Sequence, residues 1–421
     1  MQQKVKKGIC YLAIALLFLL SLYYLPLLYF GCASFKTTIL VYVILLGGAI
    51  ALVDLLNHRL GFSVNPNIKV LILSTGICLL CGEYALRFVF KKHLTYTELN
   101  DKPYISSYTL VYDWGSIRQY LIGNKNYWYL TNQPGSVWIA SIDGHTFTHR
   151  QNALGFREEE KQPQSDDPQH LIIGIGDSFA EGIGATGDST WLQLMADNLN
   201  TDSACHVRTY NAGISGSDVY FEYLVLDSLL QTYQPNTVVL GINTSDIHDI
   251  VIKGGRNRFK PGGKLKYNSP PWWEPLYAVS FLFRAVVHGS TKLHWTLLTV
   301  EEEAVKNKQA IDSIETAIYR FNSLVKQHRA KLLVVLHPRE HEVVSGNFPF
   351  DILAGKLAAD TSLHVINMQK EFARTGLITK QNSSDYFWKN DLHHNADGYR
   401  VMGTIIAGYI REKGLVCSAH K

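Results

Sequence analysis

The stretch from Ile172 to Gly182 constrains the fold of this chain more than any other. It is an apolar run that ends abruptly in Gly176-Asp177-Ser178, and a small polar turn follows it. This pattern is typical of a buried strand that stops at a sharp turn on the carboxyl edge of a sheet. Two interpretations of Ser178 follow, which this stretch alone does not separate. The serine either caps the next helix, or it is a nucleophile held at the edge of an open α/β sheet.

The segments after Ser178 alternate between the two kinds of secondary structure. Strands are predicted at 207–210, 237–243, 331–336 and 364–367, and amphipathic helices at 191–199, 219–233 and 311–329. This alternation predicts a mostly parallel sheet that is covered on both faces. In such sheets the ligand crevice lies beyond the carboxyl ends of the strands. Ser178, Gly216 and Asn243 all follow predicted strands, so we expect them at that edge.

A second polar group lies near the end of the chain, between Asn390 and Tyr399. A carboxylate two residues before a histidine, as in Asp391 and His393, can orient the imidazole and stabilise its cation. The simpler interpretation is a helix N-terminus, which Asn395 would cap.

These blocks resemble those of the SGNH, or GDSL-type, hydrolase superfamily. The matching stretches are Gly176-Asp177-Ser178 with Gly182, Asn211 to Gly216, Gly241-Ile242-Asn243, and Asp391-Leu392-His393 with Asn395 and Gly398-Tyr399. Thr244 departs from the pattern, because an Asp usually follows the Asn of the third block. The resemblance implies a three-layer α/β/α, flavodoxin-like domain with a mostly parallel sheet.

The resemblance also implies roles for individual residues. Ser178 would be the nucleophile, His393 the general base and Asp391 the acid that orients it. The backbone N–H groups of Ser178 and Gly216 and the side-chain amide of Asn243 would form the oxyanion hole. Each such donor contributes about 3 kcal/mol in the transition state.

Other residues are candidates beside these. His394 is a competing base, because the family's commoner Asp-x-x-His spacing would select it. We prefer His393, whose distance to Asn395 and Gly398 matches the family's His-x-Asn-x-x-Gly spacing better. As further substrate contacts we consider Asp177, His394, His337, Trp272 and Trp273. No metal and no cofactor are expected.

Residues 1–92 contain three long apolar runs, which we expect to span a membrane at about 8–30, 37–55 and 69–90. The first could instead be a signal peptide, but its length and the two later runs favour an uncleaved helix. The third is interrupted by Glu83 and Arg87, which are four residues apart and can neutralise each other near an interface. Lysines and arginines favour an N-terminus inside, so three spans would place the rest of the chain outside the cytoplasm. If the third run does not span the membrane, the rest of the chain would lie on the cytoplasmic side instead.

Beyond the membrane region we expect a connecting segment of short β pieces and loops at 93–165, and an SGNH-like domain at 166–415. Residues 253–300 are an insertion in that domain. It begins with a basic, Gly-rich loop that contains Lys253, Arg256, Arg258, Lys260, Lys264 and Lys266. The insertion is either a solvated loop with a helix packed on the core, or a lid that faces the bilayer or a glycan. The adjacent Trp272 and Trp273 suit sugar stacking or a membrane interface.

Composition excludes some alternatives. The net charge of +4 gives no strong preference for nucleic acid. Cys78 and Cys81 form a C-x-x-C inside an apolar run without a partner pair, so we expect core or lipid-facing residues there. Pairing of Cys205 with Cys417 remains open.

The sequence therefore predicts a multi-pass membrane protein with an extracytoplasmic serine esterase that acts on an O-acyl ester of a cell-envelope glycan. An O-acyltransferase of an extracytoplasmic polysaccharide would use the same residues. A lysophospholipase-like lipid esterase and a non-catalytic glycan-binding subunit are further alternatives, although a binding module has no need to keep all four catalytic residue types. The expected partners are an acylated glycan or lipid substrate, membrane lipid and membrane proteins of envelope assembly. The oligomeric state stays open.

Overall fold

The computed structural model describes residues 35–59, 65, 67–89, 117–122, 125–130, 134–157, 170–201, 206–260, 273, 280–290, 293 and 297–416. The chain divides into two compact units. The helical unit comprises Met1–Asp113 and Ser269–Glu303, and the sheet unit comprises Trp114–Asn268 and Ala304–Lys421. The predicted span at 8–30 lies outside the described residues, as do Cys205, Cys417, Lys264, Lys266 and Trp272.

The helical unit contains α2 (Phe35–Arg59), α3 (Asn67–Tyr84), the π-helical turn η2 (Ala85–Val89) and α9 (Phe281–Ser290). Helix α3 packs against both α2 and α9. Among the described helices, α3 is the one long and apolar enough to cross a membrane, and α2 contains a shorter apolar stretch at Tyr42–His58. The thiols of Cys78 and Cys81 on α3 are free and exposed, which excludes a buried core position.

Glu83 joins the three helices. Its buried carboxylate accepts hydrogen bonds from the hydroxyls of Tyr42 and Ser280 and from the backbone N–H of Phe281 at 2.8 Å. A carboxylate at this place caps the N-terminus of α9, where the helix dipole favours negative charge. The predicted neutralisation of Glu83 by Arg87 is not tested, because the side chain of Arg87 lies outside what the structure describes.

The sheet unit is built on β5 (His170–Gly176), β6 (Val207–Asn211), β7 (Thr237–Asn243), β8 (Lys331–His337) and β9 (His364–Asn367). All neighbours are parallel, and the strand order is β6-β5-β7-β8-β9. This confirms the predicted α/β fold with a mostly parallel sheet. The order is the flavodoxin-like one, in which the ligand crevice lies where the order reverses, here between β5 and β7.

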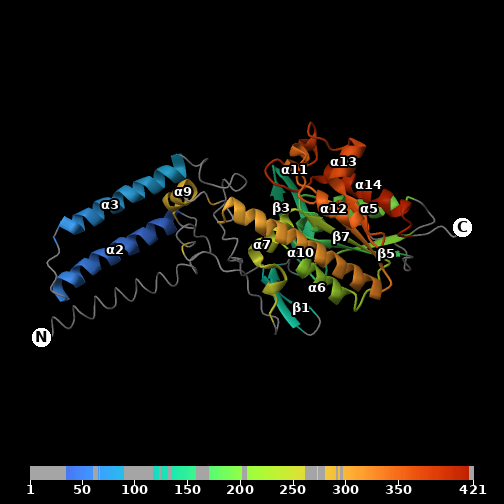
Figure 1. Ribbon diagram of the computed structural model, residues 1–421, viewed down its shortest axis with the longest axis horizontal. Helices are drawn as coiled ribbons and strands as arrows, with labels where there is room; N and C mark the ends of the chain where they lie inside the picture. Colours follow the sequence, from blue (N-terminus) through green and yellow to red (C-terminus); the bar gives the residue numbers. More distant parts are fainter. Residues whose placement is uncertain are drawn as a thin grey trace. The chain divides into compact units, whose positions relative to one another are not determined.

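Helices cover both faces of this sheet. On one face, α5 (Trp191–Leu199), α13 (Met368–Thr375) and α14 (Ala396–Glu412) form a core with the strands that includes Trp191, Met402 and Ile172. Figure 1 shows α6 (Val219–Leu229) and α10 (Val300–Gln327) on the opposite side. The shorter α11 (Glu340–Ser345) and α12 (Asp351–Ala358) follow β8, and α12 contacts β9.

Helix α10 begins earlier than the prediction of 311–329. Thr299 and Glu302 form reciprocal bonds at its start, with Glu302 N–H donating to Thr299 Oγ1 at 3.2 Å and Thr299 N–H donating to Glu302 Oε2 at 3.0 Å. This capping pair stabilises a first turn that is rich in glutamate. The apolar periodicity alone does not reveal that polar turn.

Two antiparallel hairpins precede β5. They are β1 (Ile117–Ile122) with β2 (Lys125–Leu130), and β3 (Val137–Ile142) with β4 (His145–Arg150). Asp143 and Gly144 join β3 to β4 with φ angles of 50° and 81°. An Asp-Gly pair suits such a two-residue turn because both residues tolerate positive φ. The hairpin agrees with the sequence, in which an alternating stretch from Ser136 to Ile142 is followed directly by the turn pair Asp143-Gly144.

Candidate active site

The turn after β5 places Ser178. Gly176 has a φ of 154°, and a Cβ there would lie 2.4 Å from the carbonyl oxygen of Gly241, so the position requires glycine. Asp177 caps the short helix α4 (Ser178–Glu181), because its Oδ1 accepts from the Phe179 N–H at 2.9 Å. Its Oδ2 accepts from the Ser245 hydroxyl at 3.0 Å. The cap is therefore Asp177, and the interpretation of Ser178 as the cap is wrong.

His393 lies against this serine. Its Nε2 is 2.7 Å from Ser178 Oγ, and its Nδ1 is hydrogen-bonded to Asp391 Oδ1. The same carboxylate oxygen accepts from the His393 backbone N–H at 3.1 Å. A carboxylate only accepts, so Nδ1 carries the proton and Nε2 is left to accept from the serine hydroxyl. This arrangement can remove a proton from Ser178.

His394 occupies a different environment from its neighbour. Its side chain is fully buried among the rings of Phe179, Phe387 and Tyr399, and its Nδ1 lies 3.4 Å from the Tyr386 carbonyl oxygen. Burial lowers the pKa of His394 to about 3, so the ring is neutral at ordinary pH. The structure thus brings His393 to Ser178 and places His394 in the core.

Asn243 ends β7 in a defined orientation. Its Oδ1 accepts from the backbone N–H of Ser245 at 3.0 Å, so the amide nitrogen must point the other way. That nitrogen donates to His337 Nδ1 at 3.1 Å. His337 is buried, and burial lowers its pKa well below the usual value, so its neutral ring can accept this bond. His337 therefore orients Asn243.

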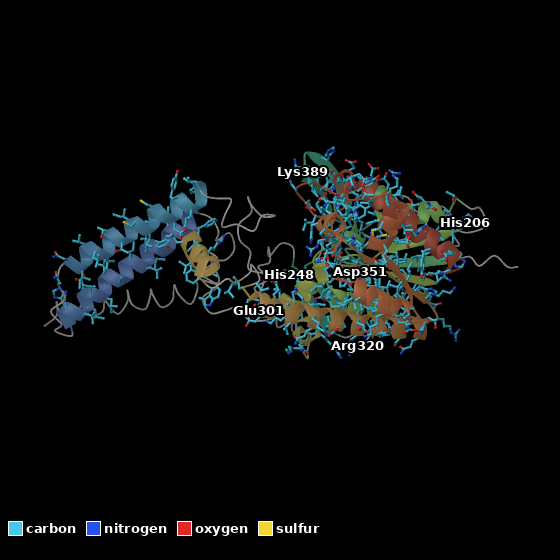
Figure 2. All side chains as sticks on the ribbon, turned by 45° about the horizontal axis from the view of Figure 1, so that its top comes forward. His206, His248, Glu301, Arg320, Asp351 and Lys389 are labelled. Atoms are coloured by element: carbon cyan, nitrogen blue, oxygen red, sulfur yellow. The ribbon has the colours of Figure 1, made fainter. Side chains whose placement is uncertain are left out.

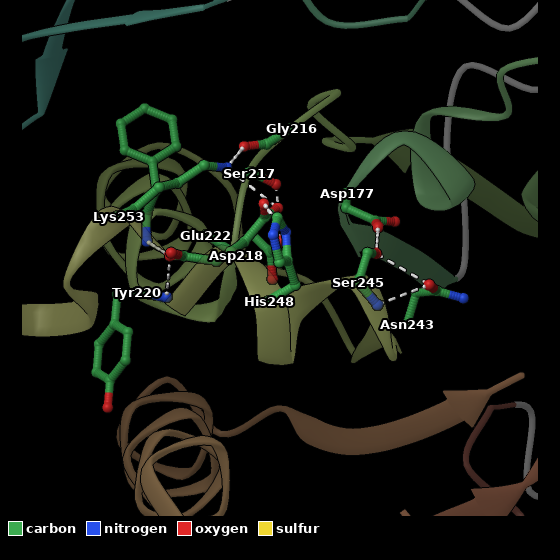
Figure 3. A network of polar contacts seen from close by, with 12 residues as sticks. Asp177, Gly216, Ser217, Asp218, Tyr220, Glu222, Asn243, Ser245, His248 and Lys253 are labelled. Atoms are coloured by element: carbon green, nitrogen blue, oxygen red, sulfur yellow. Dashed lines mark hydrogen bonds and ion pairs between the residues drawn. The ribbon is translucent and has the colours of Figure 1, made fainter. Parts of the chain in front are cut away.

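Lys253 supports the loop that contains Gly216. Its ammonium donates to the Gly216 carbonyl oxygen at 2.5 Å and forms an ion pair with Asp249 at 3.1 Å (Figure 3). Ser217 Oγ next to it donates to Glu222 at 2.7 Å. The side chain of Lys253 is 7% exposed. Lysine at the end of α7 (Ser245–Lys253) thus holds the peptide of the proposed oxyanion glycine.

Arg258 is a second buried cation beside this loop. It forms an ion pair with Asp218, with contacts of 2.5 and 2.8 Å, and Asp218 in turn caps α6. Burial alone would raise the pKa of Asp218, but the Arg258 guanidinium lowers it below the usual value. Both cations are buried, so the interpretation of 253–258 as a solvated loop is wrong for Lys253 and Arg258, whereas Arg256 is exposed.

Three buried carboxyls and one that is partly buried, Asp249, interact with one another near the site. Burial raises the pKa of Asp177, Glu222, Asp246 and Asp249. Repulsion between neighbouring carboxylates adds to the effect of burial. In the part of the chain that the structure describes, no group of three or more His, Cys, Asp or Glu side chains is arranged to hold a metal ion.

Of the remaining candidates, Trp273 belongs to the helical unit, where its ring lies 5.8 Å from that of Phe283 in α9. The sequence does not predict three residues that support the loops of the site: Arg157, Glu181 and Lys253. Glu181 accepts from the Ser215 backbone N–H at 2.8 Å and so connects α4 to the loop that contains Gly216. Such contacts produce no spacing pattern in the sequence. The one sequence signal for these residues is that they lie close to the four blocks of the SGNH resemblance.

The fold and this geometry together define a class. A parallel α/β sheet presents a serine after Gly-Asp, with a histidine and an aspartate from a C-terminal loop beside it. This is the arrangement of a Ser-His-Asp catalytic triad, as in serine hydrolases, and together with the four sequence blocks it resembles the site of SGNH, or GDSL-type, hydrolases.

Comparisons with known proteins give only distant likenesses. No family model matches the chain, and no curated protein matches it significantly. Among solved structures, a two-domain esterase (CEX) active on acetylated mannans has 12% identity and a TM-score of 0.36. The alignment covers 59% of this chain but 50% of that esterase, so the chain spans about half its length. TesA has 14% identity, a TM-score of 0.36 and coverage of 58% and 99% of the two chains. Axe2, an acetylxylan esterase from Geobacillus stearothermophilus, has 12% identity and a TM-score of 0.36, and the alignment covers 60% of this chain and 98% of Axe2. The class above rests on the fold and the site geometry, and not on these scores.

Proposed function

We propose that this chain is a membrane-anchored serine esterase that cleaves an O-acyl ester of a cell-envelope glycan through an acyl-enzyme on Ser178. The observation that carries the proposal is the 2.7 Å contact between His393 Nε2 and Ser178 Oγ, with Asp391 on the other side of the ring. A nucleophile, a base and an orienting acid in this order are what acyl transfer requires.

In the first half-reaction, Ser178 Oγ attacks the acyl carbon while its proton passes to His393 Nε2. The carbonyl oxygen becomes an oxyanion, which we propose is stabilised by the backbone N–H groups of Ser178 and Gly216 and by the amide of Asn243. Asp391 stabilises the imidazolium that forms. The intermediate collapses, the ester C–O bond breaks, and the leaving alcohol takes the proton from His393. The acyl group is then bonded to Ser178.

In the second half-reaction, His393 removes a proton from water, which attacks the acyl-enzyme carbonyl carbon. A second oxyanion forms in the same place, and its collapse returns the proton to Ser178 and releases a carboxylic acid. A sugar hydroxyl in place of water would transfer the acyl group instead, so the acceptor decides between esterase and O-acyltransferase.

We further propose that the chain crosses the membrane at 8–30, 37–55 and 69–90, and that 93–165 connects this region to an SGNH domain at 166–415 outside the cytoplasm. Large apolar side chains on α2 and α3 are exposed, among them Val43, Leu52, Val70 and Ile77. Such a surface suits contact with lipid. The insertion at 253–300 includes α9, which packs on α3, and this supports contact of the insertion with membrane lipid.

The full chain in detergent or vesicles should be acylated by p-nitrophenyl acetate, and Ser178→Ala should abolish both acylation and turnover. If the wild-type chain shows neither, the proposal is wrong. Mass spectrometry of envelope glycans with and without the active chain then identifies the reaction. Loss of acyl groups supports the esterase, a gain shows a transferase, and release of fatty acid from a lysophospholipid without any change in glycan shows a lipid esterase.

A further inference from the structure

The loop that carries the base has little regular structure of its own. We call residues 387–394 the base loop and residues 176–185 the nucleophile turn. Within the base loop, Phe387 and His394 form an isolated β-bridge. Trp388 N–H donates to the His393 carbonyl oxygen at 3.0 Å, and Asp391 N–H donates to the Trp388 carbonyl oxygen at 3.4 Å. Proton transfer to His393 needs placement within a fraction of an ångström, because a 1 Å error can cost about 10²-fold in rate. Contacts from elsewhere must therefore hold this loop.

The β3–β4 hairpin supplies such contacts. The Asp143 carboxylate accepts from the Asn390 backbone N–H at 3.2 Å and from its side-chain Nδ2 at 2.5 Å. Asn390 directly precedes Asp391 in the chain. The rings of His145 and Phe147 lie 5.1 and 6.0 Å from that of Trp388. Lys389, in the same loop, is labelled in Figure 2 at the edge of the sheet unit, where the hairpin also lies.

The chain just after this hairpin also contacts the nucleophile turn. Arg157 is 2% exposed, and its guanidinium donates to the carbonyl oxygens of Gly182 at 3.0 Å and Ala185 at 2.6 Å. The same group contacts His149 Nδ1 on β4 at 2.7 Å. Burial, with the Arg157 charge, lowers the pKa of His149 to about 3, so the neutral ring can accept this bond. Trp388 Nε1 donates to the Gly184 carbonyl oxygen at 2.9 Å, which connects the base loop directly to the nucleophile turn.

We propose that the β3–β4 hairpin is a positioning element for catalysis, in which Asp143 holds the base loop in register with the nucleophile turn that Arg157 anchors. Asp143 is a positioning residue, because it touches Asn390 and not the reacting atoms. Its φ of 50° is one that aspartate tolerates and most residues do not, so the turn itself presents the carboxylate to the loop. The proposal deepens the proposed function and rests on it for its kinetic test.

Two substitutions separate this role from a merely structural one. Asp143→Gly removes the carboxylate but keeps the positive φ without strain. Asp143→Asn keeps both the φ and an oxygen that can accept from Asn390 N–H. With p-nitrophenyl acetate and the full chain, we expect Asp143→Gly to lower kcat roughly tenfold, with KM within about twofold of wild type. Asp143→Asn should keep at least about half of the wild-type kcat. Ser141→Ala, an exposed position in the same hairpin, is the matched control and should leave kcat unchanged.

A second measurement does not depend on catalysis. Amide hydrogen exchange in the base loop should be faster in Asp143→Gly than in wild type, while exchange in β5 and β7 stays the same. The proposal is overturned if both kcat and base-loop exchange remain at wild-type values in Asp143→Gly. A raised KM with unchanged kcat would also overturn it, because the hairpin would then contact substrate. Equal losses in the Gly and Asn variants with lower thermal midpoints would show a structural role only. If the wild-type chain has no turnover, the proposed function fails, and the exchange measurement still tests the hold on the base loop.

Discussion

Ser178 and His393 meet at 2.7 Å, but the two sides of this contact are built differently. The nucleophile turn follows β5, a strand with buried residues from Ile172 to Gly176 that has parallel neighbours on both edges. The base loop lies between η8 (Ser383–Asp385) and α14; its ends, Phe387 and His394, are buried, but Lys389 and Asn390 between them are exposed. One side is placed by the interior of the sheet, and the other by contacts with a hairpin far away in the sequence.

Because of this difference, we expect the nucleophile turn and the base loop to respond differently to substitution. A buried strand keeps its geometry as long as the domain is folded, because its backbone bonds and its packing are lost only together. A surface loop opens locally at much lower cost, so single contacts decide its position. Substitutions around Ser178 should therefore act mainly through chemistry or through global stability, whereas substitutions around His393 should act through placement.

The largest effect tests the base loop itself. His393→Ala should lower kcat by about 10⁴-fold or more, since a triad without its base retains only binding and oxyanion stabilisation. His394→Asn should keep most of the activity and instead lower the thermal midpoint, because it removes a buried ring from an aromatic cluster. Steady-state rates and melting curves of both variants provide the check. Inactivity of a folded His394→Asn with an active His393→Ala would reverse the assignment.

The next effect tests the sheet edge opposite the base. Asn243→Ala should lower kcat about 10²- to 10³-fold with little change in KM, as expected when one oxyanion donor is lost. Rates with p-nitrophenyl acetate measure this loss. Arg256→Ala, at an exposed position on the sheet unit, serves as the control. A loss confined to KM would assign Asn243 to ground-state binding.

A smaller effect is expected at the loop that contains Gly216. Lys253→Met removes the bond to the Gly216 carbonyl and leaves Asp249 without its ion pair, so kcat should fall roughly tenfold and stability should decrease. Lys260→Met, an exposed lysine a few residues later, should change neither. Kinetics and thermal unfolding of the pair give the answer. Wild-type kcat in Lys253→Met would mean that the loop holds its shape without the lysine.

The smallest effect is a pH dependence of stability. The folded-state pKa of His394 is about 3 and the unfolded value is about 6.5, so only the unfolded chain binds this proton between those values. Stability is therefore lost as pH falls from about 6.5 towards 3. His394→Asn should flatten the slope of unfolding free energy by up to about 1.4 kcal/mol per pH unit in that window. Denaturant titrations at pH 7, 6 and 5 compare the two slopes, and parallel slopes would show that His394 does not carry this linkage.

Much of the architecture could be predicted from the sequence. The apolar runs that form β5, β7 and β8, the alternation with amphipathic helices, and the Asp143-Gly144 hairpin turn all follow from local periodicity and turn chemistry. Ser178 could be singled out for the same reason, because a polar residue directly after a buried strand lies at the carboxyl edge of the sheet.

Only the tertiary structure decided which polar groups meet. It placed His393 rather than His394 against Ser178, buried Lys253 and Arg258 within a loop that looks solvated in sequence, and paired Asp143 with Asn390. Local patterns report how a segment buries its own face, since backbone geometry repeats every two or 3.6 residues. A hydrogen bond between residues 247 positions apart depends on how the whole chain folds back, and no local period records it.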